Sequence, residues 1–396
     1  MGKSGAVIRG GVATLFLLIT PVLESQGQGQ LPFSALPQNV SAPAENPQSA
    51  EKIALGKLLF WDPILSGNRD VACASCHHPR SGYAEDRDLS IGVNGVGFGR
   101  SRRFQSPNSI PFVKRNSPTM LNVGFAGANK AGEYAPTAAP MFWDMRVASL
   151  ESQSLEPIKS FEEMRGDTYP EDKAVETVVA RVNAIPEYRV LFAKAFANEN
   201  AVTGVNLGKA LAAFGRSLVA NNAPFDRYMR GDRNAMTAGQ IEGMRRFERV
   251  GCSECHNGPM FSDYKLHVLG VPDNRKLVKS DNGIPDNGKR AYSESGMSDT
   301  PYAFRTASLR NLRYTAPYMH SGVFDTLLDV LEFYDDAPEN PNVGRRDVDR
   351  LVRRLDDPDD EAGAIITFLE ALNDDSFDKT IPSHVPSGLN PGGRIQ

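Results

Sequence analysis

The chain has 396 residues, 40% of them hydrophobic, which is enough for two domains with buried cores. Its 44 Lys and Arg residues nearly balance its 48 Asp and Glu residues, so no strongly basic surface is implied and nucleic acid is not an expected partner. We interpret the local charge clusters as solvated surface: Arg100, Arg102 and Arg103, then Arg345 and Arg346, and the acidic run 356–361.

The first 27 residues are typical of a secretory signal peptide. Lys3 and Arg9 supply a charged start, residues 11–23 supply a short apolar stretch, and Ser25 and Gly27 are small residues near a cleavage point. The apolar stretch is short for a membrane span and is interrupted by proline. We therefore expect an exported protein that is not inserted in the membrane after cleavage, with an uncleaved anchor as the alternative.

The next segments form a pattern that occurs twice. Residues 28–48 are rich in Gln, Pro, Ser and Ala and predict a mobile leader. Ile53–Phe60 predicts a short amphipathic helix that precedes Cys73-Ala74-Ser75-Cys76-His77, and Ala238–Val250 predicts a helix that precedes Cys252-Ser253-Glu254-Cys255-His256. The two copies, 179 residues apart, indicate a duplicated unit.

The remaining predicted elements are mostly helical, and strand-like alternation is scarce. Residues 100–141 and 281–300 are rich in Pro, Gly, Asn or Ser and predict long loops. Further helices are expected over Lys173–Ala184, Pro186–Ala197, Leu207–Asn221, Thr326–Tyr334 and Ala362–Leu372. The fold class is therefore mainly α with long loops.

The two Cys-x-x-Cys-His motifs predict two covalently bound haem c groups. The thiols add to the haem vinyl groups, and the adjacent His77 or His256 binds the iron. A redox-active dithiol or a zinc site is the alternative for a lone Cys-x-x-Cys. All four cysteines of the chain lie in the two motifs and a His completes both, which argues against that alternative. The ligand on the other side of each iron then decides between electron transfer and peroxide chemistry.

Longer stretches accompany the motifs: Gly56–Pro63 with Leu65-Ser66-Gly67, Arg115–Thr119 with Leu121 and Asn122, Phe142-Trp143-Asp144 with Arg146, Phe225–Tyr228, Gly258-Pro259 with Phe261, and Thr315–His320. Over nearly the whole chain after residue 27, the sequence resembles the bacterial dihaem cytochrome c peroxidase and MauG family. The resemblance implies two cytochrome c-like haem domains. Residues 28–222 would hold the peroxide-reacting haem, residues 223–361 would hold the electron-transfer haem, and a C-terminal tail, residues 362–396, would pack back on the first domain.

One departure from the family concerns the first haem. Peroxidases of this family carry a His in a Ser-Ile-Gly-His segment, sixteen residues after the His of the first motif, and this His caps the iron until the enzyme is reduced. Here the segment is Ser90-Ile91-Gly92-Val93, and a valine side chain cannot bind iron. His78 is interpreted as a surface residue. The first haem is therefore expected to be five-coordinate or water-bound.

A second departure concerns the other haem. Ordinary family members supply a Met fourteen residues after the His that corresponds to His320, whereas this chain has Tyr334 there, as MauG does. The resemblance implies that Tyr334 is the second ligand of this iron. Alternatively Tyr334 only packs in an apolar helical stripe, and Met297, Met319 or His267 is the ligand.

The resemblance also assigns residues around the first haem. Trp143 would carry electrons between the haems, with a core Trp as the alternative. Glu163 would act as general acid–base toward peroxide, Gln153 would orient peroxide or water, and Pro157 would shape the pocket. Without the resemblance, Glu163 would be interpreted as solvated surface.

The family holds a calcium ion between its haem domains. The corresponding oxygen ligands are the side chain of Asn116 and the main-chain carbonyls of Thr315 and Pro317, whereas an ordinary turn residue is the alternative for Asn116. The remaining histidines are interpreted as structural, haem-edge or surface residues: His267, His320 and His384.

Together these features predict a periplasmic, MauG-type dihaem oxidoreductase. It would use hydrogen peroxide at an open first haem, store oxidising equivalents on both haems through Trp143, and oxidise a partner protein at Trp residues. One alternative is a cytochrome c peroxidase that takes electrons from a small cytochrome or cupredoxin. Another is a pure electron carrier, which requires two protein ligands on each iron.

Overall fold

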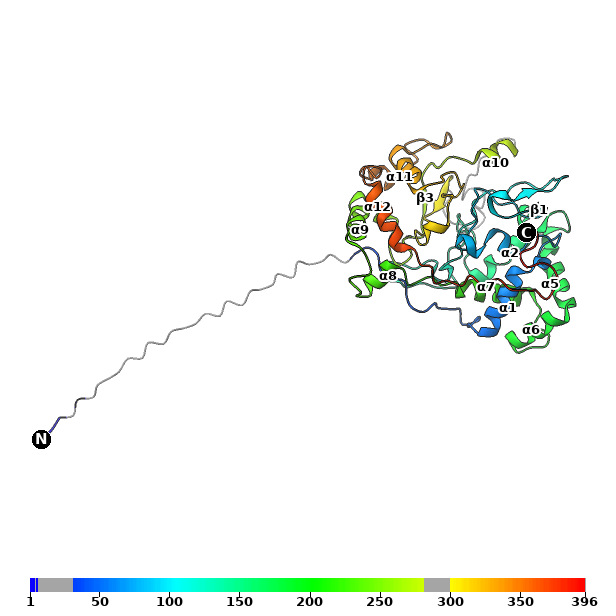
Figure 1. The fold of residues 1–396 in the computed structure, drawn as a ribbon, viewed down its shortest axis with the longest axis horizontal. Coiled ribbons are helices and arrows are strands. Elements are labelled where there is room, and N and C mark those ends of the chain that lie inside the picture. The colour runs from blue at the N-terminus through cyan, green and yellow to red at the C-terminus, as the bar shows by residue number, and fades with distance from the viewer. Residues whose placement is uncertain (4, 6–30, 281–299, 396) are drawn as a thin grey trace. The chain divides into compact units, whose positions relative to one another are not determined.

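Helices form most of the regular structure in the computed structural model of the chain, which describes residues 1–3, 5, 31–280 and 300–395 (Figure 1). In these residues the α-helices are α1 (Ala50–Trp61), α2 (Cys73–Cys76), α3 (Leu150–Gln153), α4 (Glu156–Lys159), α5 (Ala174–Ala184), α6 (Pro186–Phe196), α7 (Gly204–Ser217), α8 (Pro224–Met229), α9 (Ala238–Val250), α10 (Arg275–Ser280), α11 (Leu327–Asp336) and α12 (Ala362–Leu369). The strands described form two antiparallel pairs: β1 (Gly95–Val96) with β2 (Arg103–Phe104), and β3 (Leu266–Val268) with β4 (Ala303–Arg305). The prediction of a mainly α fold with long loops is confirmed.

Two predicted features fall outside the described residues. The signal peptide, residues 1–27, lies almost wholly outside them, and so does the loop over 281–300 that contains Met297. Within the described ranges, no helix combines the length and the apolar character that crossing a membrane requires.

The helices that precede the two motifs begin at polar capping residues. At α1, Ser49 Oγ accepts a hydrogen bond from Lys52 N at 3.2 Å. At α9, Thr237 and Gln240 form a capping box, in which each side chain accepts from the main-chain nitrogen of the other residue. The bounds predicted for α9 are confirmed.

The helix predicted over 207–221 is shifted toward the N-terminus and runs over Gly204–Ser217. It begins earlier because Thr203 Oγ1 caps it by accepting from Asn206 N at 3.1 Å. It ends earlier because Asn122 offers other partners to the chain after Ser217: Asn122 N donates to Leu218 O, and the Asn122 side chain pairs with both main-chain groups of Ala220. This tertiary contact is not visible in the local sequence.

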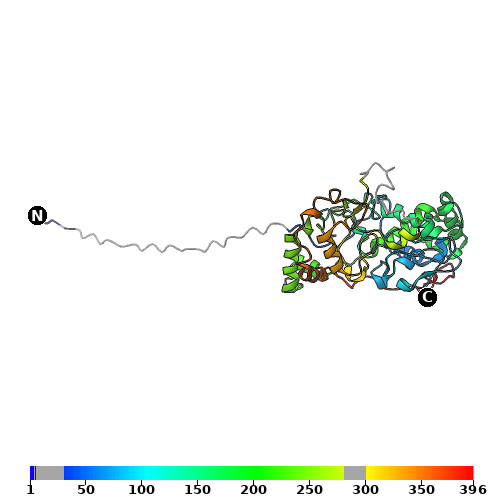
Figure 2. The same ribbon diagram turned by 90° about the horizontal axis from the view of Figure 1, so that it is seen from above.

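The same helix crossing occurs in both halves of the chain. At Gly56 on α1, an added Cβ would lie 2.0 Å from Ala210 O on α7, and at Gly243 on α9 it would lie 2.1 Å from Ala364 O on α12. Only glycine permits so close an approach of two helix backbones. The α1–α7 pair and the α9–α12 pair lie in opposite halves of the unit Pro32–Gln396 (Figures 1 and 2). The repeated geometry agrees with the duplication expected from the motifs.

Adding a methyl group at Gly243 is expected to destabilise the protein, because the new Cβ would overlap the Ala364 carbonyl. Overpacking of this kind lowers the free energy of unfolding by about 1–3 kcal/mol. Gly239→Ala on the same helix is the matched control, since its nearest new contact would be 3.6 Å away and alanine is the better helix former. Urea unfolding should give Gly243→Ala the lower midpoint, and equal midpoints for the two variants would contradict the prediction.

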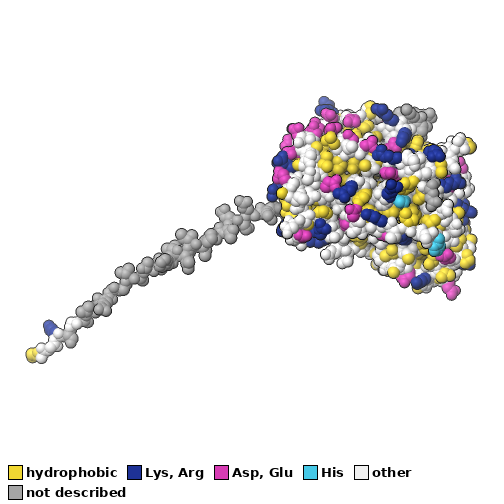
Figure 3. Space-filling model, in the orientation of Figure 1, with side chains coloured by type: hydrophobic (Ala, Val, Ile, Leu, Met, Phe, Trp, Pro, Cys, Tyr) yellow, Lys and Arg dark blue, Asp and Glu magenta, His cyan; other side chains and the backbone are white. Residues whose placement is uncertain are grey.

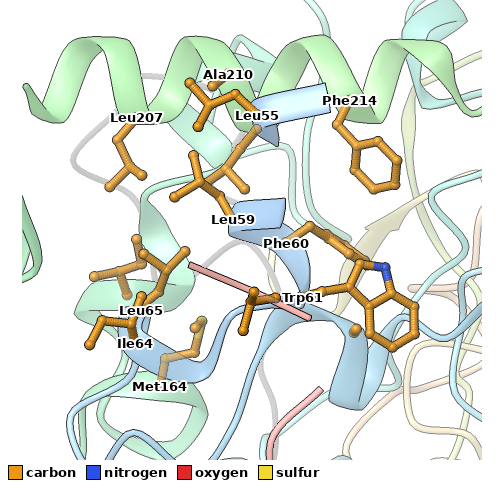
Figure 4. Packing of buried hydrophobic residues seen from close by; sticks show 14 of the residues in the cluster. Leu55, Leu59, Phe60, Trp61, Ile64, Leu65, Met164, Leu207, Ala210 and Phe214 are labelled. Atoms are coloured by element: carbon orange, nitrogen blue, oxygen red, sulfur yellow. The ribbon is translucent and has the colours of Figure 1, made fainter. Parts of the chain in front are cut away.

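Among the described residues, the largest apolar core lies around the first motif and is built from α1, α5, α6 and α7 together with the loops between them; Figure 4 shows part of it. Leu55 and Leu59 on α1 point toward α7, and Phe60 and Trp61 fill the space beneath Phe214. The residues labelled in Figure 4 are Leu55, Leu59, Phe60, Trp61, Ile64, Leu65, Met164, Leu207, Ala210 and Phe214. This core fixes the end of α1 from which the chain leads into the first motif.

Residues 31–48, the described part of the predicted mobile leader, pack against the rest of the protein. The prediction of a mobile leader is therefore wrong for these residues. Phe33 is only 2% exposed, and its ring stacks on Phe261 with the centroids 5.3 Å apart. It also contacts the rings of Phe225, Phe247 and Phe368. Two apolar residues, Phe33 and Leu36, are enough to anchor a segment whose average composition is polar.

The chain after α12 extends across the first-motif half. Ser387 Oγ donates to Asp62 Oδ1 at 2.6 Å, and Gly392 N donates to Trp61 O at 2.7 Å. Farther on, Arg394 N donates to Asp70 O at 2.9 Å. These bonds hold residues 387–394 against the segments that lead into the first motif. The boundaries of the two haem domains stay a prediction.

The charge clusters differ in their exposure. The aspartates of the acidic run are exposed on the part of the surface where α9, α11 and α12 lie (Figure 3), as predicted. Arg102 was predicted to be solvated, and this is wrong: it is 2% exposed. Its guanidinium donates to the carbonyls of Ile91, Gly92 and Gly97. Burial of this cation is possible because main-chain oxygens satisfy its donors.

Candidate active site

The first Cys-x-x-Cys segment forms the single helical turn α2, with His77 at its C-terminal end. Ser75 Oγ accepts from Ala72 N at 3.0 Å and donates to Gly392 O at 2.8 Å, so both neighbouring segments hold this turn in place. His77 Nδ1 lies 3.0 Å from Tyr83 O. In the tautomer that donates this hydrogen bond, Nε2 keeps its lone pair for a metal.

The second motif repeats this arrangement. His256 Nδ1 lies 2.9 Å from Phe261 O, so Nε2 is again the nitrogen available to a metal. The residues that supply the two carbonyls, Tyr83 and Phe261, both have left-handed backbones, with φ of 56° and 52°. Burial lowers the pKa of both imidazoles, which keeps them neutral and therefore able to bind a metal.

Both motifs fit a covalently bound haem by the chemistry of their donors. The cysteines are free thiols, and burial raises the pKa of Cys73 and of Cys252 to about 12. Next to Cys252, Cys255 and His256 lies a mostly apolar cavity, which is the environment that a porphyrin requires. The structure thus places two thiols and one metal-binding nitrogen together at each motif.

Val93 stands at the sequence position where the family's displaceable His was expected. Val93 is fully buried, and its N–H donates to Glu163 O at 2.9 Å. Glu163 is half-buried and lies close enough to Cys73 and Cys76 that its charge acts on both thiols. The segment that lacks a ligating side chain therefore lies directly against the predicted acid–base residue.

The surroundings of Glu163 make it a weak acid. Burial, and secondly the charge of Glu162, raise the pKa of Glu163 to about 7, while Arg146 acts in the opposite direction. At neutral pH the carboxyl group is therefore present in both its charged and neutral forms, which suits a residue that accepts and returns a proton.

Gln153 and Pro157 lie on the two short helices that lead to Glu163. Gln153 is the last residue of α3, and Pro157 lies in the first turn of α4, where its missing N–H is tolerated. Both side chains are half-buried. The structure thus places the three predicted distal residues on one continuous segment, and their individual roles stay predictions.

His78 was predicted to lie on the surface, and this is wrong. Its ring is half-buried between Trp61 and Phe98, with centroids 5.5 and 4.6 Å away. Its Nδ1 accepts a hydrogen bond from Arg80 N at 3.1 Å. Burial lowers the pKa of His78 to about 4. These contacts hold the half-buried His78 ring beside α1.

Trp143 lies in the wall of the cavity beside the second motif. Its Nε1 donates to Asn116 O at 2.9 Å, and its ring meets His320 edge-on with the centroids 6.4 Å apart. His320 stacks on Phe304 at 3.6 Å, and all three rings line the cavity of the second motif. The sequence indicated a role for Trp143, but nothing in the sequence near His320 or Phe304 predicts that their rings stack.

The loop that carries Trp143 is held by a buried carboxylate. Asp144, with no exposed surface, forms ion pairs with Arg115 at 2.8 Å and with Arg146 at 2.9 Å. Arg146 in turn lies over the Phe142 ring, 3.7 Å from its centroid. Arg146 also lowers the pKa of Glu163, so the loop that carries Trp143 also influences the acid–base residue.

Three of the candidate ligands for the second iron line the same cavity: Tyr334, Met319 and His267. His267 is engaged at both nitrogens, with Nδ1 2.7 Å from Asp349 Oδ2 and Nε2 3.1 Å from Asp263 Oδ2. Burial alone would lower its pKa, but hydrogen bonds, first of all to Asp263, outweigh burial and raise the pKa to about 11. A protonated His267 cannot bind iron.

Tyr334 projects from α11 into this cavity, near both thiols of the second motif. Burial, followed by the charges of Cys255 and Cys252, holds the pKa of its phenol well above the ordinary value. The phenol is therefore neutral unless a cation replaces its proton. Met319 remains an alternative, and the assignment of Tyr334 as the ligand stays a prediction.

The three predicted calcium ligands also line this cavity: Asn116, Thr315 and Pro317. The Asn116 amide nitrogen donates to the carbonyls of Arg87 and Asp88, which leaves the amide oxygen as the acceptor for another partner. Together they offer the all-oxygen set that calcium prefers, while the calcium ion itself stays a prediction.

Comparison with known proteins agrees with this combination of features. A family model described as di-haem cytochrome c peroxidase matches residues 50–234. Cytochrome-c peroxidase IdrP1 of Pseudomonas sp. (strain SCT) is 33% identical over 365 residues, covering 86% of each chain. The methylamine utilization protein MauG of Methylorubrum extorquens is 33% identical over 347 residues, covering 87% of this chain and 85% of MauG. A crystal structure of a MauG-like protein associated with microbial copper homeostasis has a TM-score of 0.67 at 26% identity, and the match covers 86% of this chain and 95% of that one.

Proposed function

Since the chain belongs to the di-haem cytochrome c peroxidase and MauG family, we propose that it is a MauG-type oxidoreductase with two haem c domains that uses hydrogen peroxide to oxidise a partner protein. Each haem, once attached, supplies an iron that exchanges electrons, and the first also reacts with peroxide. His77 and His256 would hold the irons, each fixed in its tautomer by a main-chain carbonyl.

The proposal depends most on Val93. Its hydrocarbon side chain is buried where other family members have a His, and its main chain is bonded to Glu163. A side chain that cannot bind iron at this position supports an open first site in the resting protein, without a ligand that must first be displaced. His78 supports the same conclusion, because its contacts with Trp61 and Phe98 hold it beside α1.

Each of the predicted site residues would then have its own role. Glu163 would accept a proton from one peroxide oxygen and return it to the other, which leaves as water, and the haem held by His77 would supply the electrons for breaking the O–O bond. Gln153 orients the peroxide, and Pro157 shapes the pocket without adding a donor. Trp143 would carry charge toward the half of the chain that contains the second motif, where oxidising equivalents would be stored. They would then oxidise the partner protein, and a Trp residue of that partner is the first candidate for the oxidised group.

Replacing Tyr334 by Phe tests whether it is the second iron's ligand. The variant keeps the ring that packs in the cavity but loses the only oxygen of the side chain. We expect the ferric absorption and paramagnetic resonance spectra of the second haem to change, while those of the first haem stay the same. Tyr318→Phe is a matched control, because Tyr318 lines the same cavity and its hydroxyl is already engaged with Leu312 O at 3.0 Å. An unchanged second-haem spectrum in Tyr334→Phe would refute the assignment.

Two further assignments extend the proposal. Asn116, Thr315 and Pro317 would bind calcium, and chelation should then alter the spectra of the haems on either side of Trp143. The protein would act in the periplasm after removal of residues 1–27, which N-terminal sequencing of the exported protein would test.

A cytochrome c peroxidase is the second candidate, because a relative named as such is as similar to this chain as MauG is. The two functions differ in whether the protein must be reduced before it reacts with peroxide. Under the first proposal, peroxide added to the fully oxidised protein changes the spectra of both haems at once. Rapid turnover with a reduced small cytochrome, and only after pre-reduction of the protein, would instead support the peroxidase.

A further inference from the structure

The turn that carries Glu163 has an uncommon backbone. Phe161–Arg165 forms a π-helical turn, in which Arg165 N donates to Ser160 O at 2.9 Å and Gly166 N to Phe161 O at 3.1 Å. Such turns are rare and occur mostly as single turns, frequently at functional sites. A wide turn of this kind needs support from its neighbours, and the position of the Glu163 carboxyl group depends on that support.

Two glycines from other segments press against this turn. Gly67 N donates to Met164 O at 2.7 Å, and an added Cβ at Gly67 would lie 2.0 Å from Arg165 O. At Gly92 an added Cβ would lie 2.1 Å from Glu163 O. The residue after Gly92, Val93, donates its N–H to the same Glu163 oxygen. The turn is thus held by main-chain contacts on two sides.

Backbone freedom does not explain these glycines. Neither Gly67 nor Gly92 has a positive φ, unlike Gly82 or Gly166, so an L-amino acid could adopt either backbone conformation. What excludes a side chain is the carbonyl oxygen opposite each of them. Both glycines are therefore needed for close approach to the turn of Glu163.

We propose that Gly67 and Gly92 are positioning residues that set the location of the Glu163 carboxyl group above the first motif. They act through the main chain of residues 163–165 and contact no reactant themselves. This inference rests on the proposed role of Glu163 in peroxide chemistry. It adds the segments Leu65-Ser66-Gly67 and Ser90-Ile91-Gly92 to the active site as its scaffold.

A double-mutant cycle on the full, haem-loaded protein tests the proposal. The variants are Gly67→Ala, Gly92→Ala, Glu163→Gln and each glycine variant combined with Glu163→Gln. Gly363→Ala is the control, because an added Cβ there would meet nothing within 4 Å. The rate of the first haem's absorbance change with hydrogen peroxide is measured against pH, and the second haem's ferric spectrum reports on folding.

We expect each glycine variant to slow the reaction by roughly tenfold to a hundredfold, because a shift of about 1 Å in a catalytic group has effects of this size. The limb of the pH profile near 7 should move toward the ordinary pKa of glutamate as the carboxyl group becomes more solvated. In the Glu163→Gln background the same substitutions should have no further effect, since they act through the lost carboxyl group.

Losses that simply add in the combined variants would overturn the proposal, and so would glycine variants with an unchanged pH profile. A glycine variant that loses the second haem's native spectrum would assign that glycine to folding as a whole, which also overturns it. If Glu163→Gln itself reacts as fast as the unchanged protein, the proposed function loses its acid–base residue. A different result, in which Glu163→Gln is slow but the glycine variants react as fast as the unchanged protein, would contradict only the positioning role of the glycines.

Discussion

Glu163→Gln is expected to slow the reaction with hydrogen peroxide by about 10²–10⁴-fold, the usual contribution of a positioned acid–base group. The substitution keeps the shape of the side chain and removes its ability to take up a proton. The main-chain bond from Val93 N to Glu163 O does not depend on the side chain, so the turn should remain in place. Stopped-flow measurement of the first haem's absorbance after mixing with peroxide gives the rate.

The pH dependence of the same reaction follows from the pKa of about 7 for Glu163. The first step needs the charged carboxylate, because it accepts a proton from peroxide. The rate should therefore rise as the pH increases through about 7 and level off above it, as the carboxyl group loses its proton. In Glu163→Gln this limb should be absent.

Glu162→Gln is the matched control for this pair of measurements. Glu162 lies in the same turn, and its charge is the second cause of the raised pKa of Glu163. Its removal should move the limb to lower pH and leave the plateau rate nearly unchanged. A plateau that falls as far in Glu162→Gln as in Glu163→Gln would assign the effect to the turn rather than to one carboxyl group.

Local patterns were sufficient for the helices that precede the motifs and for the haem motifs, but not for the ends of α7. The capping residues Ser49 and Thr237 precede regular apolar runs, and the Cys and His residues of each motif lie next to one another in the sequence. These features depend on neighbours within a few residues, so a single sequence reveals them. The departure at Val93 could be found only through the resemblance to the family, whose peroxidases carry a His at this distance from the His of the first motif.

The features that were missed depend on how the chain folds back on itself, either within a loop or between distant segments. Arg102 is buried because carbonyls of residues 91–97 surround its guanidinium, and nothing in its own neighbourhood distinguishes it from the exposed Arg100. Phe33 anchors a polar segment through aromatic rings that lie about 190 to 335 residues further along the chain. The roles of Gly67 and Gly92 likewise become visible only when the turn of Glu163 lies opposite them.

Trp143→Phe is expected to separate the responses of the two haems to peroxide. The indole donates to Asn116 O and meets the His320 ring edge-on. His320 in turn stacks on Phe304 in the wall of the cavity beside the second motif. Phenylalanine can fill much of the same space but lacks the N–H and is far harder to oxidise. The first haem should still react, whereas the second haem's absorbance change should slow by at least about tenfold, equivalent to about 1.4 kcal/mol of barrier.

Trp61→Phe is the matched control for this prediction. Trp61 is the other tryptophan of the chain, is fully buried beside the first motif, and packs on Phe60 and His78 rather than on the residues that connect the two halves. If passage of charge needs an indole between the halves, Trp61→Phe leaves the second haem's response intact. Equal responses of the second haem in the two variants would exclude Trp143 as the carrier. Charge would then have to pass through other groups in the wall, of which the stacked His320 and Phe304 rings are the nearest candidates.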